Sequence, residues 1–255
     1  MFLTFASFAQ LPEGFEGTSL PNLATGDWVL PSGTWKVINE DISTGPSAQT
    51  WGIIGVASSC VGTRSAYLNR ENVVDGTFAV DWLVMPQTTI PNNGQLRFLS
   101  KLTQASNQGS VYTIRVSTTS QTDINSFTTI QTWTETEINA VFNECEEKVV
   151  QFPAAYINQP VYVAFVMTND NGDRWIIDEV NIVEQCLDPT NLGATPTATT
   201  ANLTWTGNGA SYEIEHLVGA GATPTGVATG TSTTNSFTQT GLTANTQYCY
   251  PISDS

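Results

Sequence analysis

The chain has 255 residues, which is long enough for one large domain or for a large domain with a smaller companion. Charged residues make up only 12% of it, and 23 acidic against 8 basic residues give a formal net charge of −15. This balance argues against a surface for nucleic acid or for an anionic membrane, and it favours cations, glycans or proteins as partners in calcium-rich extracellular water.

The first ten residues, MFLTFASFAQ, have the apolar character of the end of a secretory signal peptide. Ser7 and Ala9 have the small-x-small spacing of a signal-peptidase site that cuts before Gln10. No Lys or Arg precedes this run, and it is too short to span a bilayer. We expect residues 1–10 to be a signal-peptide remnant and the protein to be secreted or on the cell surface. The alternative is a short N-terminal β-strand. No later segment is long and apolar enough to cross a membrane.

From Gly14 onward, short runs of Thr, Val, Ile, Ser and Asn are separated by turn residues, which predicts an all-β protein. Apolar and polar residues alternate along Gln95–Leu102 and Val111–Ser117, as in half-buried antiparallel strands. Val161–Met167 is apolar on both faces, which predicts a central strand. The nearest helix candidate is the short segment Glu135–Cys145.

The link between this central strand and the next apolar run is TNDNGDR. Its Asn171-Gly172 pair predicts a hairpin turn. Asp170 and Asp173 resemble part of a calcium loop, but the fuller series of ligands and its distal Glu are missing, so the link is not predicted to be a site by itself.

The run Trp175–Val183, WIIDEVNIV, sets a carboxylate among apolar residues. Alternation puts Asp178 on the same face as Ile176, Val180 and Ile182. A carboxylate there must be neutralised, hydrogen-bonded or bound to a cation. The pattern leaves two interpretations open, a metal ligand or an acceptor of backbone N–H bonds, and a bulge could reverse the parity.

The composition changes near Cys186–Pro189, where charges almost vanish and Thr, Gly and Ala dominate. The order P-T-N-L, L-T-W, Y-E-I-E and G-L-x-x-x-T-x-Y resembles a fibronectin type III domain, with Tyr248 as the Tyr of a tyrosine corner. Ser255 follows soon after, so the last strand of such a domain has no residues. We expect a fragment of a longer chain; the alternatives are an imposed chain boundary or a strand supplied by another molecule.

Four segments of the larger part of the chain carry a second resemblance: GFEG (14–17), WKVINED (35–41), VDWLVMP (80–86) and WIIDEVNI (175–182). In this order they resemble the cleaved-adhesin or choice-of-anchor J domains of secreted Bacteroidetes proteins, which are MAM-like jelly rolls. Together the two resemblances imply a jelly-roll β-sandwich over residues 11–186. A smaller, incomplete fibronectin type III-like β-sandwich follows over residues 187–255.

The resemblance to the cleaved adhesins implies structural calcium. Carried over by position, its ligands are Glu16, Asn39, Asp41 and Asp178. Asn39 stands where the family has Asp, which lowers the ligand charge at that end. Carboxylates, amide oxygens and backbone carbonyls together suit calcium. On this interpretation the ion supplies the countercharge that Asp178 needs, and the closing strand joins the two ends of the domain. We expect Glu179, on the opposite face, to be solvated or hydrogen-bonded.

The four cysteines are widely spaced and form no CxxC pair, so they do not indicate a metal cluster. In a secreted chain they allow two disulfides with three connectivities. We favour Cys186 with Cys249, which bracket the C-terminal segment, and Cys60 with Cys145.

Enzyme motifs are missing from the sequence. The only histidine, His216, lies in the smaller domain, so the larger one has no base for a Ser/His/Asp or Cys/His arrangement. A pair of carboxylates for glycoside hydrolysis is not excluded, but nothing singles one out.

We therefore predict a non-enzymatic adhesive or structural protein whose partner is a protein or glycan on a host or neighbouring cell. One alternative is a carbohydrate-binding accessory module of a secreted hydrolase, which would need exposed aromatic side chains. The candidates are Trp28, Trp35, Trp51, Trp82, Trp133 and Trp175. The other alternative is a self-assembling extracellular filament, in which copies of the chain donate strands to one another.

Overall fold

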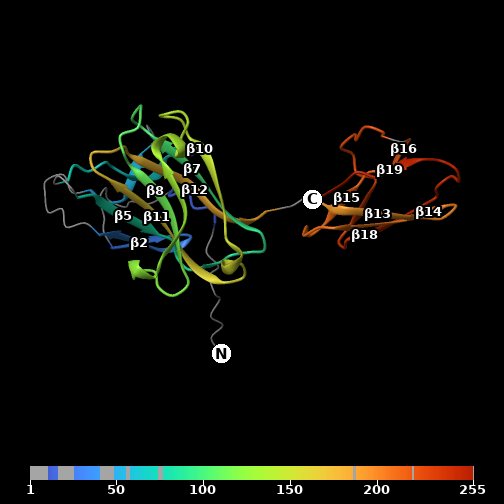
Figure 1. The fold of residues 1–255 in the computed structure, drawn as a ribbon, viewed down its shortest axis with the longest axis horizontal. Coiled ribbons are helices and arrows are strands. Elements are labelled where there is room, and N and C mark those ends of the chain that lie inside the picture. Colours follow the sequence, from blue (N-terminus) through green and yellow to red (C-terminus); the bar gives the residue numbers. More distant parts are fainter. Residues whose placement is uncertain are drawn as a thin grey trace. The chain divides into compact units, whose positions relative to one another are not determined.

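The structure is a computed structural model, and it describes residues 11–16, 26–40, 49–55, 58–73, 77–185, 188–219 and 221–254. The chain divides into two compact units, one ending at Glu184 and the other beginning at Gln185. Almost all regular structure is β, so the all-β prediction is confirmed: a jelly-roll β-sandwich is followed by a smaller β-sandwich (Figure 1). No helix in the described ranges is long and apolar enough to cross a membrane.

The first unit consists of two antiparallel sheets. The seven-stranded sheet has the order β1 (Gly26–Leu30), β2 (Gly33–Asn39), β5 (Ala79–Val84), β11 (Pro160–Asn169), β8 (Val111–Ser117) and β9 (Thr128–Thr134), with β6 (Thr88–Thr89) beside β11. The five-stranded sheet has the order β10 (Glu146–Gln151), β7 (Gly94–Leu102), β12 (Trp175–Glu184), β4 (Arg64–Leu68) and β3 (Gly52–Gly55). Short helical turns are η1 (Ile124–Ser126), α1 (Glu135–Ile138) and η2 (Ala154–Tyr156).

The three strands predicted from their periodicity are confirmed as parts of β7, β8 and β11. β11 lies between β5 and β8 in the middle of its sheet, and it is apolar on both faces for that reason. Phe165 on one face belongs to the main core, whereas Ala164 and Val166 on the other face pack with Trp82 in a second cluster.

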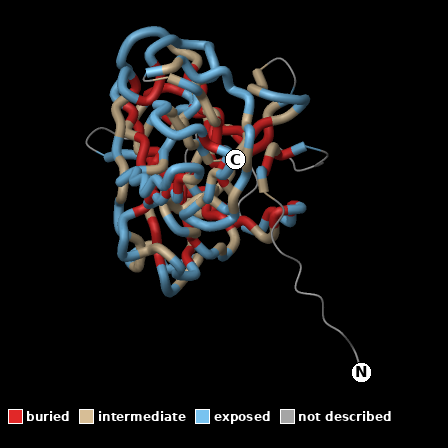
Figure 2. Tube along the Cα trace, turned by 90° about the vertical axis from the view of Figure 1, so that its right-hand side faces the viewer, coloured by how far each residue is buried: buried red, intermediate tan, exposed pale blue. Residues whose placement is uncertain are grey.

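Aromatic side chains fill the main core between the two sheets. The ring of Trp175 lies 5.0 Å from that of Tyr112, 5.5 Å from that of Trp51 and 5.9 Å from that of Phe165, measured between centroids. Such edge-to-face and tilted contacts add to the gain from burying large apolar surfaces. Buried residues occur along most strands of the unit. In Figure 2, where the whole chain is drawn, exposed stretches (pale blue) form much of the outline.

β12 carries a bulge beside Asp178. Asp178 pairs with Leu99 of β7, but Asn181 pairs with Arg97, so the register shifts by one residue between them. Glu179, inside this shift, has a positive φ of 49°, a conformation that non-glycine residues adopt rarely.

The bulge reverses the alternation of side chains along β12. Ile177 before it and Val180 after it both belong to the main core, with Ile182 packed against that core. Asp178 therefore lies on the opposite face, together with Ile176. The predicted grouping of Asp178 with Val180 and Ile182 is wrong, because the sequence pattern does not reveal the extra residue.

The link from β11 to β12 is not a hairpin, since these strands lie in different sheets. The hairpin prediction at Asn171-Gly172 is thus wrong. Gly172 is needed for a close approach instead: a Cβ there would lie 1.9 Å from Ser110 Oγ. The carboxylate of Asp173 holds the link in place by accepting bonds from the backbone N–H groups of Thr103 and Gln104.

The predicted helix over Glu135–Cys145 is only one turn long in the structure. α1 ends at Ile138, which is buried in the main core, whereas Val141 and Phe142 are exposed. A longer helix would have no apolar surface to pack against, and tertiary packing supplies most helix stability.

The second unit contains three small antiparallel sheets, each with its own strand order. They are β13 (Thr190–Pro196), β14 (Thr200–Thr206) and β18 (Ser236–Thr240); β17 (Gly230–Ser232), β15 (Tyr212–Ile214) and β20 (Ile252–Asp254); and β16 (Leu217–Val218) with β19 (Tyr248–Cys249). Trp205 and Tyr212 form its core, with ring centroids 5.1 Å apart. The Tyr248 hydroxyl accepts a 2.8 Å bond from the Thr243 N–H, which is the arrangement of a tyrosine corner.

Candidate functional site

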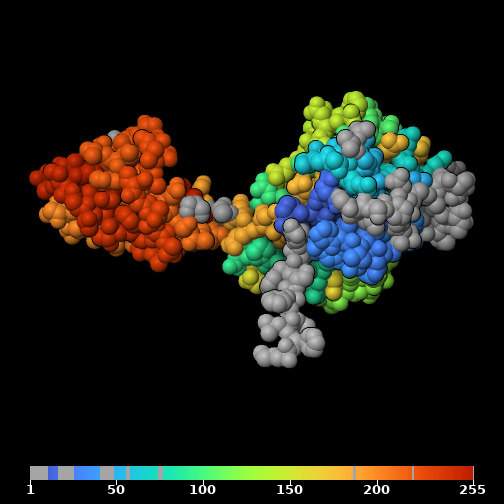
Figure 3. Space-filling model, turned by 180° about the vertical axis from the view of Figure 1, so that it is seen from behind, coloured from blue at the N-terminus to red at the C-terminus, as the bar shows by residue number. Residues whose placement is uncertain are grey.

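The N-terminal segment 11–16 is joined to β12 at the bulge. Glu13 and Val180 form an isolated antiparallel bridge, with backbone N–O distances of 2.8 and 3.0 Å. On the face seen in Figure 3, this segment (darkest blue) lies at the surface beside cyan residues of the region around β3 and β4. The closing strand therefore holds the beginning of the described chain.

Phe15 and Glu13 fix this segment to the body of the unit. The Phe15 ring is fully buried, 5.4 Å from the ring of Trp35 in an edge-to-face contact. The buried Glu13 carboxylate accepts bonds from the Phe15 N–H and from the Ser32 hydroxyl. Ser32 in turn accepts a bond from the Trp35 indole N–H. The buried Glu13 carboxylate, bonded to Phe15 and Ser32, thus acts as a structural acceptor, and Ser32 links it to Trp35.

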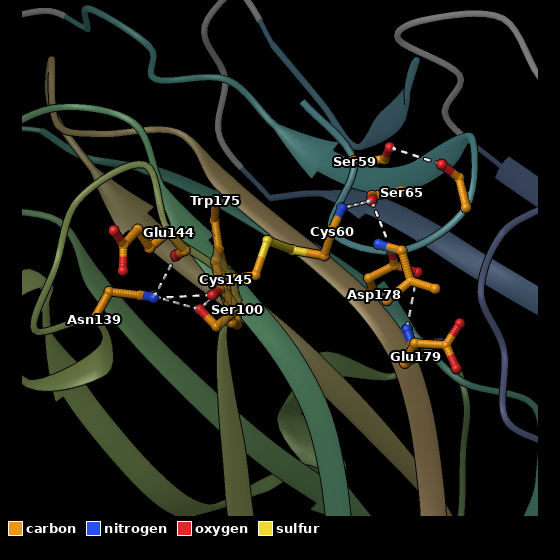
Figure 4. Close-up of a disulfide and its surroundings, with 12 residues drawn as sticks. Ser59, Cys60, Ser65, Ser100, Asn139, Glu144, Cys145, Trp175, Asp178 and Glu179 are labelled. Carbon is orange, nitrogen blue, oxygen red and sulfur yellow. Dashed lines mark hydrogen bonds between the residues drawn. A yellow bond between two sulfur atoms is a disulfide. The ribbon is translucent and has the colours of Figure 1, made fainter. Parts of the chain in front are cut away.

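Asp178 is completely buried, and its carboxylate accepts three hydrogen bonds (Figure 4). Oδ2 accepts from the Val61 N–H at 2.9 Å and from the Ser65 hydroxyl at 2.8 Å, while Oδ1 accepts from the Glu179 N–H at 2.9 Å. Burial raises the pKa of the Asp178 carboxyl despite these bonds, and the nearby charge of Glu179 adds to the effect.

Glu16 lies at the surface, against the loop that precedes β4. Its carboxylate accepts bonds from the Thr63 N–H, the Thr63 hydroxyl and the Arg64 N–H. The hydroxyl bond of Thr63 is the main cause that lowers the pKa of Glu16. Glu16 and Asp178 thus both hold the short segment 61–65, which leads into β4.

Acidic side chains converge on Gly14. A Cβ at this glycine would lie 2.8 Å from Glu179 Oε1, 3.7 Å from Asp178 Oδ1 and 3.8 Å from Glu16 Cγ. Only glycine leaves this space free. A hollow of about 270 Å³ opens beside it, and the residues that line it include Glu13, Glu16 and Glu179. None of these carboxylates forms a salt bridge with a described Lys or Arg.

Asn39 lies at a different place. It is the last residue of β2, opposite the buried Asp81, and its side-chain N–H donates to the Gln49 carbonyl. The buried Glu71 carboxylate accepts from the Gln49 N–H beside it. Asp41 lies outside the described residues. Of the four predicted ligands, the structure therefore brings Glu16 and Asp178 to one glycine and leaves Asn39 on the other sheet.

Carboxylate oxygens of Asp178 and Glu179 lie near Gly14, and such oxygens are ligands that a hard cation prefers. Glu16 approaches the same place only with its Cγ, because its carboxylate is bonded to Thr63 and Arg64. The arrangement is not a preformed cage: no group of three or more described His, Cys, Asp or Glu residues is placed to hold a metal ion. Calcium at this site stays a prediction. Resident calcium would supply countercharge to Asp178, Glu16 and Glu179 and would join the N-terminal segment to the closing strand.

Glu13 and Glu179 were not among the predicted site residues. Glu13 precedes the GFEG motif, and its burial depends on Ser32, which no local pattern connects with it. Glu179 was assigned to the opposite face from Asp178 by simple alternation. Only the bulge brings both side chains toward Gly14.

A disulfide ties two loops together next to Asp178. Cys60 and Cys145 are bonded, with Cα atoms 5.7 Å apart, so this predicted pairing is confirmed (Figure 4). Cys60 is also held by a bond from its N–H to the Ser65 hydroxyl. Cys249 carries a free thiol, and its predicted partner Cys186 lies outside the described residues.

The tryptophans considered for sugar stacking are mainly core residues. Five of the six are at most 1% exposed: Trp28, Trp35, Trp51, Trp82 and Trp175. Trp133 is half-buried and contacts Phe98. Trp82 donates its indole N–H to Glu40 and is covered by the Arg115 guanidinium, 4.6 Å from the ring centroid.

No protein family model matches the sequence, and no curated protein matches it. Among solved structures, the chain is similar to the K1 cleaved adhesin domain of Lys-gingipain from Porphyromonas gingivalis, at 22% identity and a TM-score of 0.45 over 59% of this chain and 90% of that domain. The K2 cleaved adhesin domain of Lys-gingipain is 15% identical, with a TM-score of 0.47 over 68% of this chain and 97% of that domain. A carbohydrate-binding module of Caldicellulosiruptor saccharolyticus in complex with mannohexaose is 10% identical, with a TM-score of 0.40 over 58% of this chain and 89% of that module. At these identities the likenesses concern the fold alone.

Proposed function

We propose that the chain is a secreted or cell-surface adhesive protein, whose jelly-roll unit binds a protein or glycan on another surface and performs no chemistry of its own. The observation that carries this proposal is a group of exposed apolar side chains beside the disulfide. Val61 is 48% exposed, Val141 47% and Phe142 54%. They lie on two loops that the Cys60–Cys145 bond joins.

Exposed apolar side chains on a rigid surface are typical of protein-binding sites. The loops around this group are held firmly. The Asn143 N–H donates to the Leu102 carbonyl, and the Val61 N–H donates to Asp178. A surface that is already fixed loses little conformational entropy on binding.

Adhesion by the double variant Val141→Ser/Phe142→Ser tests the proposal. We expect its binding to cells or to immobilised surface protein to fall about tenfold or more, because hot-spot side chains of this size contribute about 1–2 kcal/mol or more each. Its melting temperature should change little, since both side chains are exposed. The matched control is Val29→Ser, which removes an equally apolar, 77% exposed side chain from β1. Equal loss in both variants, or no loss in the first, would contradict the proposal.

Calcium is part of the proposed function as a stabiliser of the first unit. It is supported by the carboxylate oxygens of Asp178 and Glu179 near Gly14, which form no salt bridge with a described Lys or Arg, and by the burial of Asp178. The ion would stiffen the same loop, 61–65, that presents Val61. Calcium ligands of this kind are negatively charged oxygens with some freedom to adjust.

Chelation is expected to lower the melting temperature of the first unit by roughly 5–10 °C, if calcium is present at about a hundred times its dissociation constant. Asp178→Asn should abolish this difference between calcium and chelator. The control is Asp173→Asn, which changes an equally buried aspartate bonded to Thr103 and Gln104; this variant should still respond to chelator. A melt of the wild type that chelator leaves unchanged would refute the calcium proposal.

The carbohydrate-binding alternative has less support, because the aromatic faces it needs are buried in five of the six tryptophans. Strand donation between copies, the filament alternative, concerns the second unit. A fibronectin type III identity for that unit is part of the proposal, supported by the Tyr248 corner and by the strands that flank it.

A further inference from the structure

A small pocket opens beside Phe142, at the surface to which the proposed function assigns binding. Its volume is about 100 Å³, and it lies where the chain leaving β7 meets α1 and the residues after it. Leu102 and the Phe142 ring contribute apolar surface, whereas Gln104, Glu135 and Asn139 contribute polar groups. The pocket therefore suits a ligand that is apolar along part of its length and polar at one end.

Hydrogen bonds within the protein hold the walls of this pocket. The buried Asn139 side chain binds Ser100 with both ends of its amide: Oδ1 accepts from the Ser100 hydroxyl at 2.8 Å, and Nδ2 donates to the Ser100 carbonyl at 2.9 Å (Figure 4). The Glu135 carboxylate accepts from the backbone N–H groups of Gln108 and Ser110. A pocket that is already fixed loses little conformational entropy when a ligand enters it.

Glu135 places a negative charge in the pocket. Its side chain is buried, and it forms no salt bridge with a described Lys or Arg. A carboxylate can accept about four hydrogen bonds, so Glu135 keeps acceptor capacity beyond its two N–H donors. None of the described residues that line the pocket is basic, and the exposed Glu137 and Glu144 add negative charge to the same stretch of chain. A positively charged hydrogen-bond donor is the group that pairs best with such a carboxylate.

The pocket distinguishes between four kinds of ligand group. An anion is repelled by Glu135. A purely apolar side chain covers Leu102 and Phe142 but leaves the Glu135 carboxylate against hydrocarbon. A neutral donor, such as a sugar hydroxyl, brings no countercharge. A long basic side chain satisfies both parts of the pocket, because its stem packs on apolar surface while its charged end pairs with the carboxylate.

We propose that this pocket receives an arginine side chain of a partner protein, which rests on the proposed adhesive function and names the group that the same surface binds. The planar guanidinium stacks on the Phe142 ring and donates to Glu135, which the compact ammonium of lysine does less well. The formal net charge of −15 draws a basic segment of the partner to the surface. Arginine is also among the side chains that most often anchor protein interfaces.

Small probes added to the full chain test the proposal, with binding followed by NMR. The N-acetyl, N-methylamide derivative of arginine should shift the amide resonances of Asn139 and Phe142. The same derivative of citrulline, which has the shape of arginine without its charge, should bind about tenfold more weakly, and that of lysine should also bind more weakly. Equal affinity of the arginine probe and either of the others, or no shift at the pocket, would overturn the proposal.

A pair of charge variants supplies the control. Thr136→Lys adds a positive charge at an exposed position of the pocket, and it should weaken binding of the arginine probe about tenfold or more. Thr128→Lys adds the same charge at an exposed position of β9 and should bind the probe as the wild type does. Equal losses in the two variants would overturn the proposal, because attraction by the overall charge would then explain the binding.

The adhesion of Val141→Ser/Phe142→Ser shows separately whether the proposed function holds. If this double variant loses adhesion but the arginine probe does not bind the wild type, the adhesive function stands and the arginine pocket is refuted. If the probe binds the wild type at the pocket but the double variant adheres normally, the arginine pocket stands and the adhesive function of this surface is refuted.

Discussion

Asp178 shows how much a single buried charge depends on its neighbours. Its carboxylate lies on a covered face of β12, where Val61, Ser65 and Glu179 supply hydrogen bonds. These bonds agree with one of the two interpretations that the sequence left open, in which Asp178 is an acceptor of hydrogen bonds. They do not remove the penalty of burial, since the pKa of Asp178 is still raised. The two interpretations, acceptor and calcium ligand, therefore differ in their dependence on pH.

The pH dependence of stability separates them. In chelator, the raised pKa means that folded Asp178 binds a proton at higher pH than unfolded Asp178, whose ordinary value is 3.8. The wild type should then gain stability relative to Asp178→Asn as pH falls from the raised pKa toward 3.8, and lose it as pH rises. In calcium the carboxylate is held ionised, so the stability of the wild type relative to Asp178→Asn should fall as pH falls. Urea unfolding of both proteins at several pH values, with and without calcium, measures this difference in stability. Identical pH profiles in calcium and in chelator would exclude the ion.

At the scale of elements, the disulfide connects two loops that the sheets alone leave apart. Cys60 precedes β4 and Cys145 precedes β10, and these strands are separated in the five-stranded sheet by β7 and β12. The two cysteines are 85 residues apart in sequence. A crosslink over such a distance stabilises the folded state mainly by restricting the unfolded chain.

We expect Cys60→Ser/Cys145→Ser to lower the free energy of unfolding of the first unit by roughly 3–4 kcal/mol. The same variant should weaken adhesion, because Val61 and Phe142 lie on the loops that the bond joins. The wild type in reducing agent should lose the same amount of stability as this variant. Urea unfolding followed by tryptophan fluorescence measures the free energy of unfolding in both cases. Cys249→Ser is the control, since that thiol is free in the structure and lies in the other unit. A loss below about 1 kcal/mol would contradict the structural role of the disulfide.

The main core of the first unit and the core of the second unit differ in size. The first includes Trp175, Tyr112 and Phe165 among many other buried residues, and the second consists of six, including Trp205 and Tyr212. A small core stabilises its unit less, because less apolar surface is removed from water.

Calorimetry of the full chain should therefore show two transitions, with the smaller one at lower temperature. Chelator and the loss of the Cys60–Cys145 bond should shift only the larger transition. A single transition that responds to both treatments would contradict this description.

Periodicity was informative where a strand is regular and its faces are simple. β8 matches the predicted Val111–Ser117, and the two apolar faces of Val161–Met167 match the central position of β11. It failed where local pattern and tertiary packing disagree. Asn171-Gly172 is a strong hairpin signal, yet the close approach to Ser110 sends the chain to the other sheet. Glu135–Cys145 has a helical pattern, but the core ends at Ile138.

The sequence by itself determined the fold class and the strongest strands, because alternating side chains and turn residues are local features. It left three disulfide connectivities open, and the structure confirms the favoured Cys60–Cys145 pairing. It also marked Asp178 as a charge that needs a partner. Only the tertiary structure decided which partners it has. The bulge in β12 and the bridge from Glu13 to Val180 bring Glu16, Asp178 and Glu179 to Gly14, while Asn39 ends on the other sheet. Such a meeting of distant segments depends on strand register, and one inserted residue changes register without changing the composition of the strand.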